Sequence, residues 1–133
     1  MKHTSAALVL VLLAVAGCGG SDSTFTADYN EAVEPLSELG QGLGTNPAAF
    51  DRLAKSTSQT RKNLAKLDAP EDARDEFEAL LGRLDAVTAD LTEVASAERS
   101  RDVVRQRRAA KELVRSSDAV ERAETALKQA VEG

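Results

Sequence analysis

The feature that most constrains the fold of this chain is a run of apolar residues that recur at steps of three and four. The clearest run occupies one continuous segment: Ala73, Phe77, Leu80, Leu84, Val87, Leu91 and Val94. This spacing puts the whole set on one face of an α-helix. After residue 24, no segment alternates with the two-residue period of a β-strand. The chain beyond that point is therefore predicted to be all-α.

The same reasoning predicts four helices, over residues 26–43, 47–67, 71–96 and 101–131. Pro35 lies inside the first segment and is expected to kink or split it. Asn46 followed by Pro47 is a strong start signal for the second, with Asn as the cap and Pro as the first helical residue. Because amphipathic helices joined by short connections pack side by side, residues 25–133 are predicted to form an up-down antiparallel four-helix bundle.

The boundary between the last two helices is the least clearly marked. If the apolar stripe of the third predicted helix is continued beyond Val94 at the same steps, it reaches Glu98, Arg101 and Arg105, whose charged side chains are not core residues. An apolar stripe resumes in a new phase, at Val103, Ala110, Leu113, Val120, Leu127 and Val131. We therefore predict a turn near residues 96–100, with one continuous long helix as the alternative. Ser117 and Glu124 fall at core positions of the new phase.

The first 17 residues have the form of a signal peptide. Lys2 precedes an apolar run from Ala6 to Ala16, whose 11 residues are too few to span a bilayer, which takes about 20. Residues 18–24, which include Gly19-Gly20-Ser21-Asp22-Ser23, are expected to form a short flexible tether.

The end of this leader, Val15-Ala16-Gly17-Cys18, resembles the lipobox of bacterial lipoproteins. The resemblance implies that Cys18 receives a lipid, that the leader is cut just before it, and that the protein is anchored to the cell membrane on its extracytoplasmic side. An ordinary secretory signal with an accidental cysteine is the alternative. More loosely, the lipobox followed by a Leu- and Ala-rich bundle with the Leu64-Ala65-Lys66-Leu67-Asp68-Ala69-Pro70 turn resembles small helical envelope lipoproteins of unknown function.

The mature chain lacks most of the residue types that commonly serve in catalysis. The chain has one His, one Met and one Cys, of which His3 and Met1 leave with the leader and Cys18 becomes modified. Nucleophiles paired with His, zinc sites built from His or Cys, and haem ligation by His or Met are thereby excluded. We therefore expect no enzyme, no metal and no cofactor. Without Lys2 the mature chain has 16 basic and 22 acidic residues, a balance of −6, which argues against nucleic-acid binding.

Charge is nevertheless unevenly distributed. Residues 68–93 hold nine acids and two bases, whereas residues 98–115 hold seven bases and three acids. Positive side chains at the start of a helix interact unfavourably with the helix dipole. Residues placed where they are locally unfavourable suggest a further role. The candidate binding residues for an acidic protein or an anionic envelope polymer are Arg99, Arg101, Arg105, Arg107 and Arg108. A solvated helix face paired with neighbouring acids is the alternative.

Two functions are compatible with these observations. The first is a non-enzymatic interaction or adaptor module, held at the membrane through the lipid on Cys18 and presenting its Arg-rich end away from that membrane. The alternative is a carrier or sensor of a small apolar ligand, whose pocket in the bundle core would be lined by Phe25, Tyr29, Phe50 and Phe77.

Overall fold

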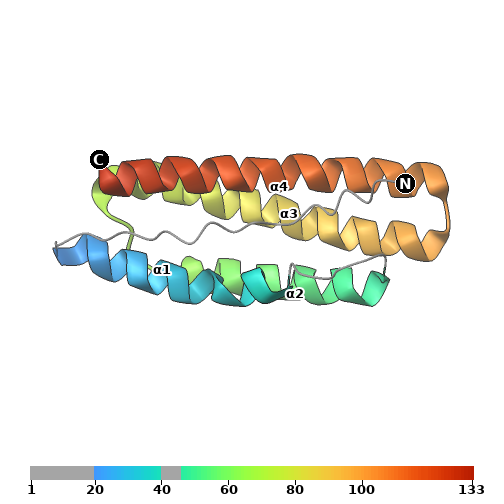
Figure 1. Ribbon diagram of the computed structural model, residues 1–133, viewed down its shortest axis with the longest axis horizontal. Coiled ribbons are helices and arrows are strands. Elements are labelled where there is room, and N and C mark those ends of the chain that lie inside the picture. Colours follow the sequence, from blue (N-terminus) through green and yellow to red (C-terminus); the bar gives the residue numbers. More distant parts are fainter. Residues whose placement is uncertain (1–19, 40–45) are drawn as a thin grey trace.

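The computed structural model describes residues 20–39 and 46–133 and confirms the all-α bundle. Four long helices run up and down in succession (Figure 1): α1 (Gly20–Leu39), α2 (Pro47–Leu64), α3 (Arg74–Ser100) and α4 (Val103–Glu132). A short 3-10 helix, η1 (Glu71–Ala73), precedes α3. The start of α1, the connection before α3 and the C-terminus lie at one end of the bundle, and the α3–α4 turn lies at the other (Figure 1).

Helix α1 corrects two expectations. It begins at Gly20, six residues before the predicted start, so residues 20–24 of the expected flexible tether are helical. Extending an existing helix adds one hydrogen bond per residue fixed, and this extension needs no new nucleus. It also continues through Pro35 without a break, so Pro35 does not split the helix. Pro35 and Glu31, the residue whose carbonyl loses its partner, are both exposed, so water can hydrate that carbonyl. The predicted residues 40–43 lie outside the described part of the chain.

Helix α2 begins as predicted. The Asn46 side chain accepts a hydrogen bond from the Ala48 N–H at 3.0 Å, and Pro47 is the first helical residue. The helix ends at Leu64 rather than at residue 67. One face of α2 is buried, and Leu67 lies partly buried beyond its end; the buried members are Phe50, Leu53, Thr57, Thr60 and Leu64.

Helices α3 and α4 are separated by a turn, which excludes the single continuous helix. The turn comes later than predicted, because α3 continues to Ser100 and α4 begins at Val103. Every residue of the stripe from Ala73 to Val94 is buried. Ala95, Ala97 and Ala109 are also buried near the turn, and their small side chains let the two helices approach closely.

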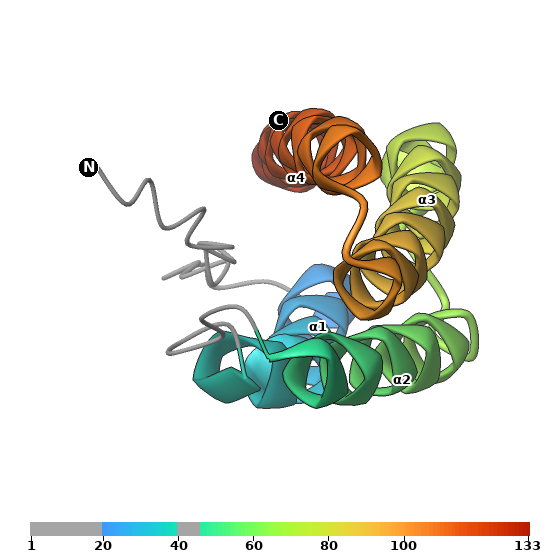
Figure 2. The ribbon, with the colours of Figure 1, turned by 90° about the vertical axis from the view of Figure 1, so that its right-hand side faces the viewer.

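Seen along the long axis of the bundle, three helices form an arc and the fourth lies on its open side. Helices α4, α3 and α2 follow one another around the arc, and α1 lies between its two ends (Figure 2). Helix α1 packs most closely on α2, and large side chains bridge it to the other two. The rings of Phe25 and Phe77 meet edge to face, with centroids 5.3 Å apart. The Tyr29 hydroxyl donates a hydrogen bond to Glu124 Oε1 at 3.0 Å, so α1 is joined to both α3 and α4.

The predicted core of α4 is correct in its second half, and in its first half it is correct at Leu113, which packs partly buried against the core, but wrong at Val103 and Ala110. Val120, Glu124 and Leu127 are buried, and the expectation that Glu124 occupies a core position is confirmed. Ser116 is buried in place of Ser117, which is only partly buried. Val103 and Ala110, predicted to be core, are exposed. A carboxyl group therefore lies inside the bundle while a valine of the same helix lies outside it.

The Tyr29–Glu124 contact predicts a particular dependence of stability on pH. Burial, the charge of Glu124 and the hydrogen bond to it all raise the pKa of Tyr29 well above its ordinary value of 10.0. The unfolded chain loses this proton near pH 10 and the folded chain keeps it, so the stabilisation is complete below pH 10 and decreases above it. The expected slope is about 1.4 kcal/mol per pH unit.

The Tyr29→Phe variant lacks this group, and its unfolding free energy should fall less steeply than that of wild type above about pH 10. Below that pH it should be less stable by about 1–3 kcal/mol, because a buried hydrogen bond is lost. Urea unfolding of both proteins across this pH range measures the difference. Parallel curves would show that the Tyr29 hydroxyl is not buried against Glu124.

Candidate functional site at the α3–α4 turn

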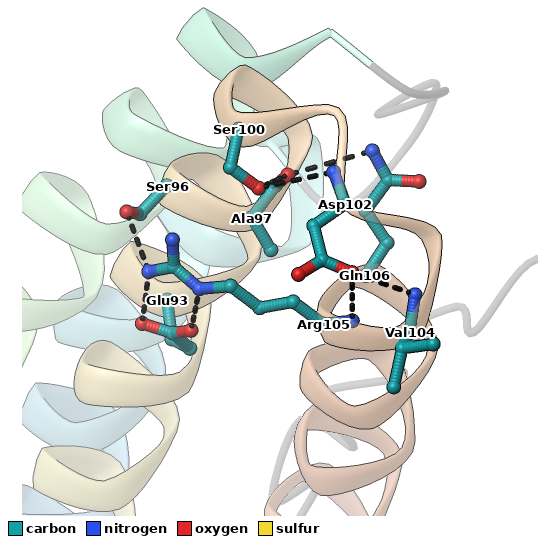
Figure 3. Close-up of polar contacts among 8 residues, drawn as sticks. All are labelled: Glu93, Ser96, Ala97, Ser100, Asp102, Val104, Arg105 and Gln106. Carbon is teal, nitrogen blue, oxygen red and sulfur yellow. Dashed lines mark hydrogen bonds and ion pairs between the residues drawn. The ribbon is translucent and has the colours of Figure 1, made fainter.

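The turn between α3 and α4 is fixed by side-chain caps that follow from the local sequence. The Asp102 carboxylate accepts hydrogen bonds from the N–H groups of Val104 and Arg105, at 3.0 and 3.1 Å (Figure 3). The Ser100 hydroxyl donates to the Ala97 carbonyl at 2.6 Å and accepts from the Asp102 N–H at 3.2 Å. Asp102 is thus the N-cap of α4, and its charge offsets part of the unfavourable interaction between the helix dipole and the cations that follow.

Arg101 has a backbone conformation that is unusual for its residue type. It closes α3 with φ of 56° and ψ of 19°, in the left-handed region, and is the only residue other than glycine with positive φ in the described ranges. Glycine is the usual residue at this helix-ending position, and a side chain there costs about 1 kcal/mol. A strained residue of this kind points to a role other than stability.

Arg105 is part of the bundle's own structure. From α4 it reaches across to α3, where its Nε and one Nη donate to the two carboxylate oxygens of Glu93 at 2.8 and 3.2 Å (Figure 3). The same Nη donates to the Ser96 hydroxyl at 2.8 Å. The hydrogen bond from Arg105, followed by its charge, lowers the pKa of the Glu93 carboxyl against the opposing effect of desolvation. This bidentate ion pair joins the start of α4 to α3.

Arg99 has a structural partner as well. Its guanidinium donates to the Asp51 carboxylate, and this hydrogen bond raises the pKa of Arg99. The pair joins the end of α3 to the first turns of α2. Arg115, further along α4, pairs with Glu112 on its own helix at 3.1 Å.

The remaining predicted residues face solvent. Arg101, Arg107 and Arg108 are exposed, as is Lys111, and within the described residues none of these four side chains makes an ion pair. The structure therefore divides the five predicted arginines. Arg99 and Arg105 pair with acids on other helices, whereas Arg101, Arg107 and Arg108 are exposed to solvent, with the charge of Arg108 also helping to lower the pKa of Glu93.

Sequence reasoning missed the apolar part of this surface. Val103, Val104 and Val114 have exposed fractions of 55%, 66% and 45% and are the exposed large apolar residues of the described chain. Asp102, directly before an apolar pair, is the cap signal that could have located the helix start. We define the tip surface as this group of exposed side chains: Arg101, Val103, Val104, Arg107, Arg108, Lys111 and Val114.

The tip surface is exposed because α1 is shorter than α3 and α4 and ends before them. Helix α1 has 20 residues and α4 has 30. Leu39 lies ten residues after Tyr29, which brings it level with Val114 of the antiparallel α4. It lies fourteen residues after Phe25, which brings it level with Leu91 of the parallel α3. Both contacts show that the first turns of α4 and the last turns of α3 extend beyond the end of α1.

The aromatic residues of the predicted ligand pocket do not gather in one place. Phe25 contacts both Tyr29 and Phe77, with ring centroids 6.2 and 5.3 Å apart. Phe50 adjoins Asp51, whose partner Arg99 lies 22 residues after Phe77 on α3, a separation of about 30 Å along the helix. No observation on the bundle therefore favours a ligand site lined by all four rings.

The remaining points concern the predicted lipid acceptor, metal binding and membrane-spanning helices. Cys18 lies outside the described residues. Among residues 20–39 and 46–133, no three His, Cys, Asp or Glu side chains are grouped so as to hold a metal ion. In the same ranges, none of the helices combines the length and the apolar character needed to cross a membrane.

Comparison of the chain with protein-family models, with curated proteins and with solved structures finds no significant match.

Proposed function

We propose that this protein is a membrane-anchored lipoprotein whose bundle is a non-enzymatic interaction module, and that its tip surface binds an anionic partner in the cell envelope. The lipobox-like sequence ending in Cys18 supports the anchor. Helix α1 begins at Gly20, so one residue separates Cys18 from the first helical residue. A lipid on Cys18 would therefore hold that end of the bundle against the membrane.

The geometry of the bundle supports a partner away from the anchoring membrane. The start of α1 and the α3–α4 turn lie at opposite ends of the bundle (Figure 1). Helix α4 has 30 residues and spans about 45 Å, several times the screening length of about 10 Å at 0.1 M salt. An upright bundle thus presents its tip surface beyond the range of the bilayer charge, toward whatever else the extracytoplasmic space contains.

The observation that carries the proposal is the composition of the tip surface. Four cations without ion-pair partners stand beside three exposed valines, in the described part of a chain whose net charge is −5. Arg101 occupies a strained conformation there, and the pairs of Arg99 and Arg105 join the turn to α2 and α3. A basic and partly apolar end of this kind suits the recognition of an anionic surface, such as an acidic protein or an envelope polymer.

The anchor is tested by replacing the proposed lipid acceptor. Cys18→Ser removes the thiol, so the variant should neither incorporate a labelled fatty acid nor shift in mass as wild type does. It should also leave the salt-washed membrane fraction, because the lipid provides the attachment. Ser21→Cys in the same background moves the thiol out of the lipobox and should not restore labelling. Unchanged labelling of Cys18→Ser would contradict the anchor.

The tip surface is tested with poly-L-glutamate, a soluble polyanion, and the full chain in phosphatidylcholine nanodiscs. Arg107→Ser combined with Arg108→Ser should weaken binding about five- to tenfold, since each exposed charge pair contributes up to about 1 kcal/mol. Arg101→Gly should weaken binding and yet raise the unfolding free energy by about 1 kcal/mol, because it relieves the left-handed strain. Arg122→Ser, which changes an exposed arginine far from the turn, is the control.

Equal binding by wild type and the double variant would contradict the assignment of the tip surface, and so would a tip variant that behaves like Arg122→Ser. A loss of stability in Arg101→Gly would show that the side chain supports the turn rather than serving a partner.

A further inference from the structure

Resting on the proposed function of the tip surface, we propose that its partner is an acidic amphipathic helix of another protein, which packs along the first three turns of α4 beyond the end of α1. The proposal specifies the kind of partner. The evidence for it is one line of residues on α4 that is buried or partly buried along one half of the helix and exposed along the other.

That line contains residues seven apart: Val103, Ala110, Ser117, Glu124 and Val131. Residues at this spacing lie on nearly the same side of a helix. Glu124 faces α1, since it accepts the hydrogen bond from Tyr29, and is 2% exposed. Ser117 and Val131 are partly buried, whereas Ala110 and Val103 are exposed. The line thus emerges into solvent at the level where α1 ends, although its exposed members are of the apolar type that a bundle core uses.

The exposed part of the line has the pattern of a helix-packing surface. Val103, Arg107, Ala110 and Val114 follow one another at steps of four, three and four, which is the spacing of a seam between helices. Arg107 contributes an apolar stem to such a seam and keeps its charged end at the edge. A second row at the same steps, Val104, Arg108, Lys111 and Arg115, runs beside it and is largely basic. An apolar seam with a basic border is complementary to an apolar seam with an acidic border.

The chain itself shows which kind of helix occupies this side of α4. Helix α1 contains five acidic residues and no basic residue. Its apolar stripe is buried, and it consists of Phe25, Tyr29, Val33 and Leu36. Along the second half of α4, an acidic amphipathic helix is therefore the neighbour. A partner helix of about 11 residues would be long enough to continue this coverage over the remaining 16 Å or so of α4.

Other occupants fit the same surface less well. A polyanion satisfies the arginines but offers nothing apolar to cover Val103, Val104 and Val114. A second copy anchored in the same membrane would present its own basic tip at the same height, and like charges repel. A protein helix with carboxylates flanking an apolar row matches both the cations and the valines.

The test compares two synthetic peptides on the full chain in phosphatidylcholine nanodiscs. One peptide is a stapled helix with leucines at steps of three and four and glutamates on both flanks, and the other has the same residues in shuffled order. Fluorescence anisotropy should show that the ordered peptide binds about tenfold more tightly, because only its leucines cover the valines together. Val103→Ser and Val114→Ser should each weaken the ordered peptide about threefold or more and leave poly-L-glutamate binding unchanged.

Ala126→Ser and Arg122→Ser change exposed residues of α4 beside the part that α1 covers, and they should leave all three affinities unchanged. Circular dichroism and the melting temperature check that every variant folds. Equal binding of the two peptides, with no effect of the valine variants, would overturn this inference while leaving the proposed function standing. Failure of both peptides and of poly-L-glutamate to bind would overturn both. Self-association that Val103→Ser abolishes would identify a second copy as the occupant and also overturn the inference.

Discussion

Two side-chain contacts determine how far α1 reaches along the bundle, and the exposed surface of the molecule depends on that reach. Phe25 meets Phe77 on α3, and Tyr29 donates to Glu124 on α4. Both contacts lie toward the end where α1 begins, and large side chains make them because the backbone of α1 packs most closely on α2. The register that they set leaves α1 level with Val114 at its end. Beyond this level, residues 46–133 form three helices in an arc (Figure 2), and Val103, Val104 and Val114 of α4 are exposed.

The elements that could be predicted from sequence are those determined by local chemistry. The three- and four-residue spacing located α3 and its buried face, and the Asn46-Pro47 pair located the start of α2. The missed features depend on tertiary placement. Nothing in the sequence of α4 indicates that its seven-residue line is covered at Glu124 and open at Val103, since that follows from the length and register of another helix. The early start of α1 was missed because Gly and Ser near a helix start suggest a tether, although a helix formed downstream extends through them.

The candidate site was predicted with similar limits. The Arg-rich segment was recognised from its composition and from its opposition to the helix dipole. Which of its members serve the fold was not predictable, because Asp51 and Glu93, the partners of Arg99 and Arg105, come from separate helices. The strain at Arg101 was also hidden, since the sequence did not place the end of α3 there.

Stability and recognition act in opposite directions at the tip surface. The caps from Ser100 and Asp102 and the two interhelical arginine pairs stabilise the turn, while the left-handed Arg101 and the exposed valines reduce stability. Surfaces that break local rules on a well-ordered frame are those where binding is expected. The proposed anchor and the basic tip lie at opposite ends of the bundle (Figure 1), which gives such a surface a defined direction.

The central claim, that α1 leaves the first turns of α4 uncovered, is tested most directly by methyl NMR of the full chain with labelled valines in phosphatidylcholine nanodiscs. A soluble gadolinium chelate relaxes methyl groups that face water. We expect strong attenuation of Val103, Val104 and Val114 and protection of Val87 and Val120, which are buried on α3 and α4 respectively. Protection of Val103 and Val104 equal to that of Val120 would show that another segment covers the tip, and it would contradict the account.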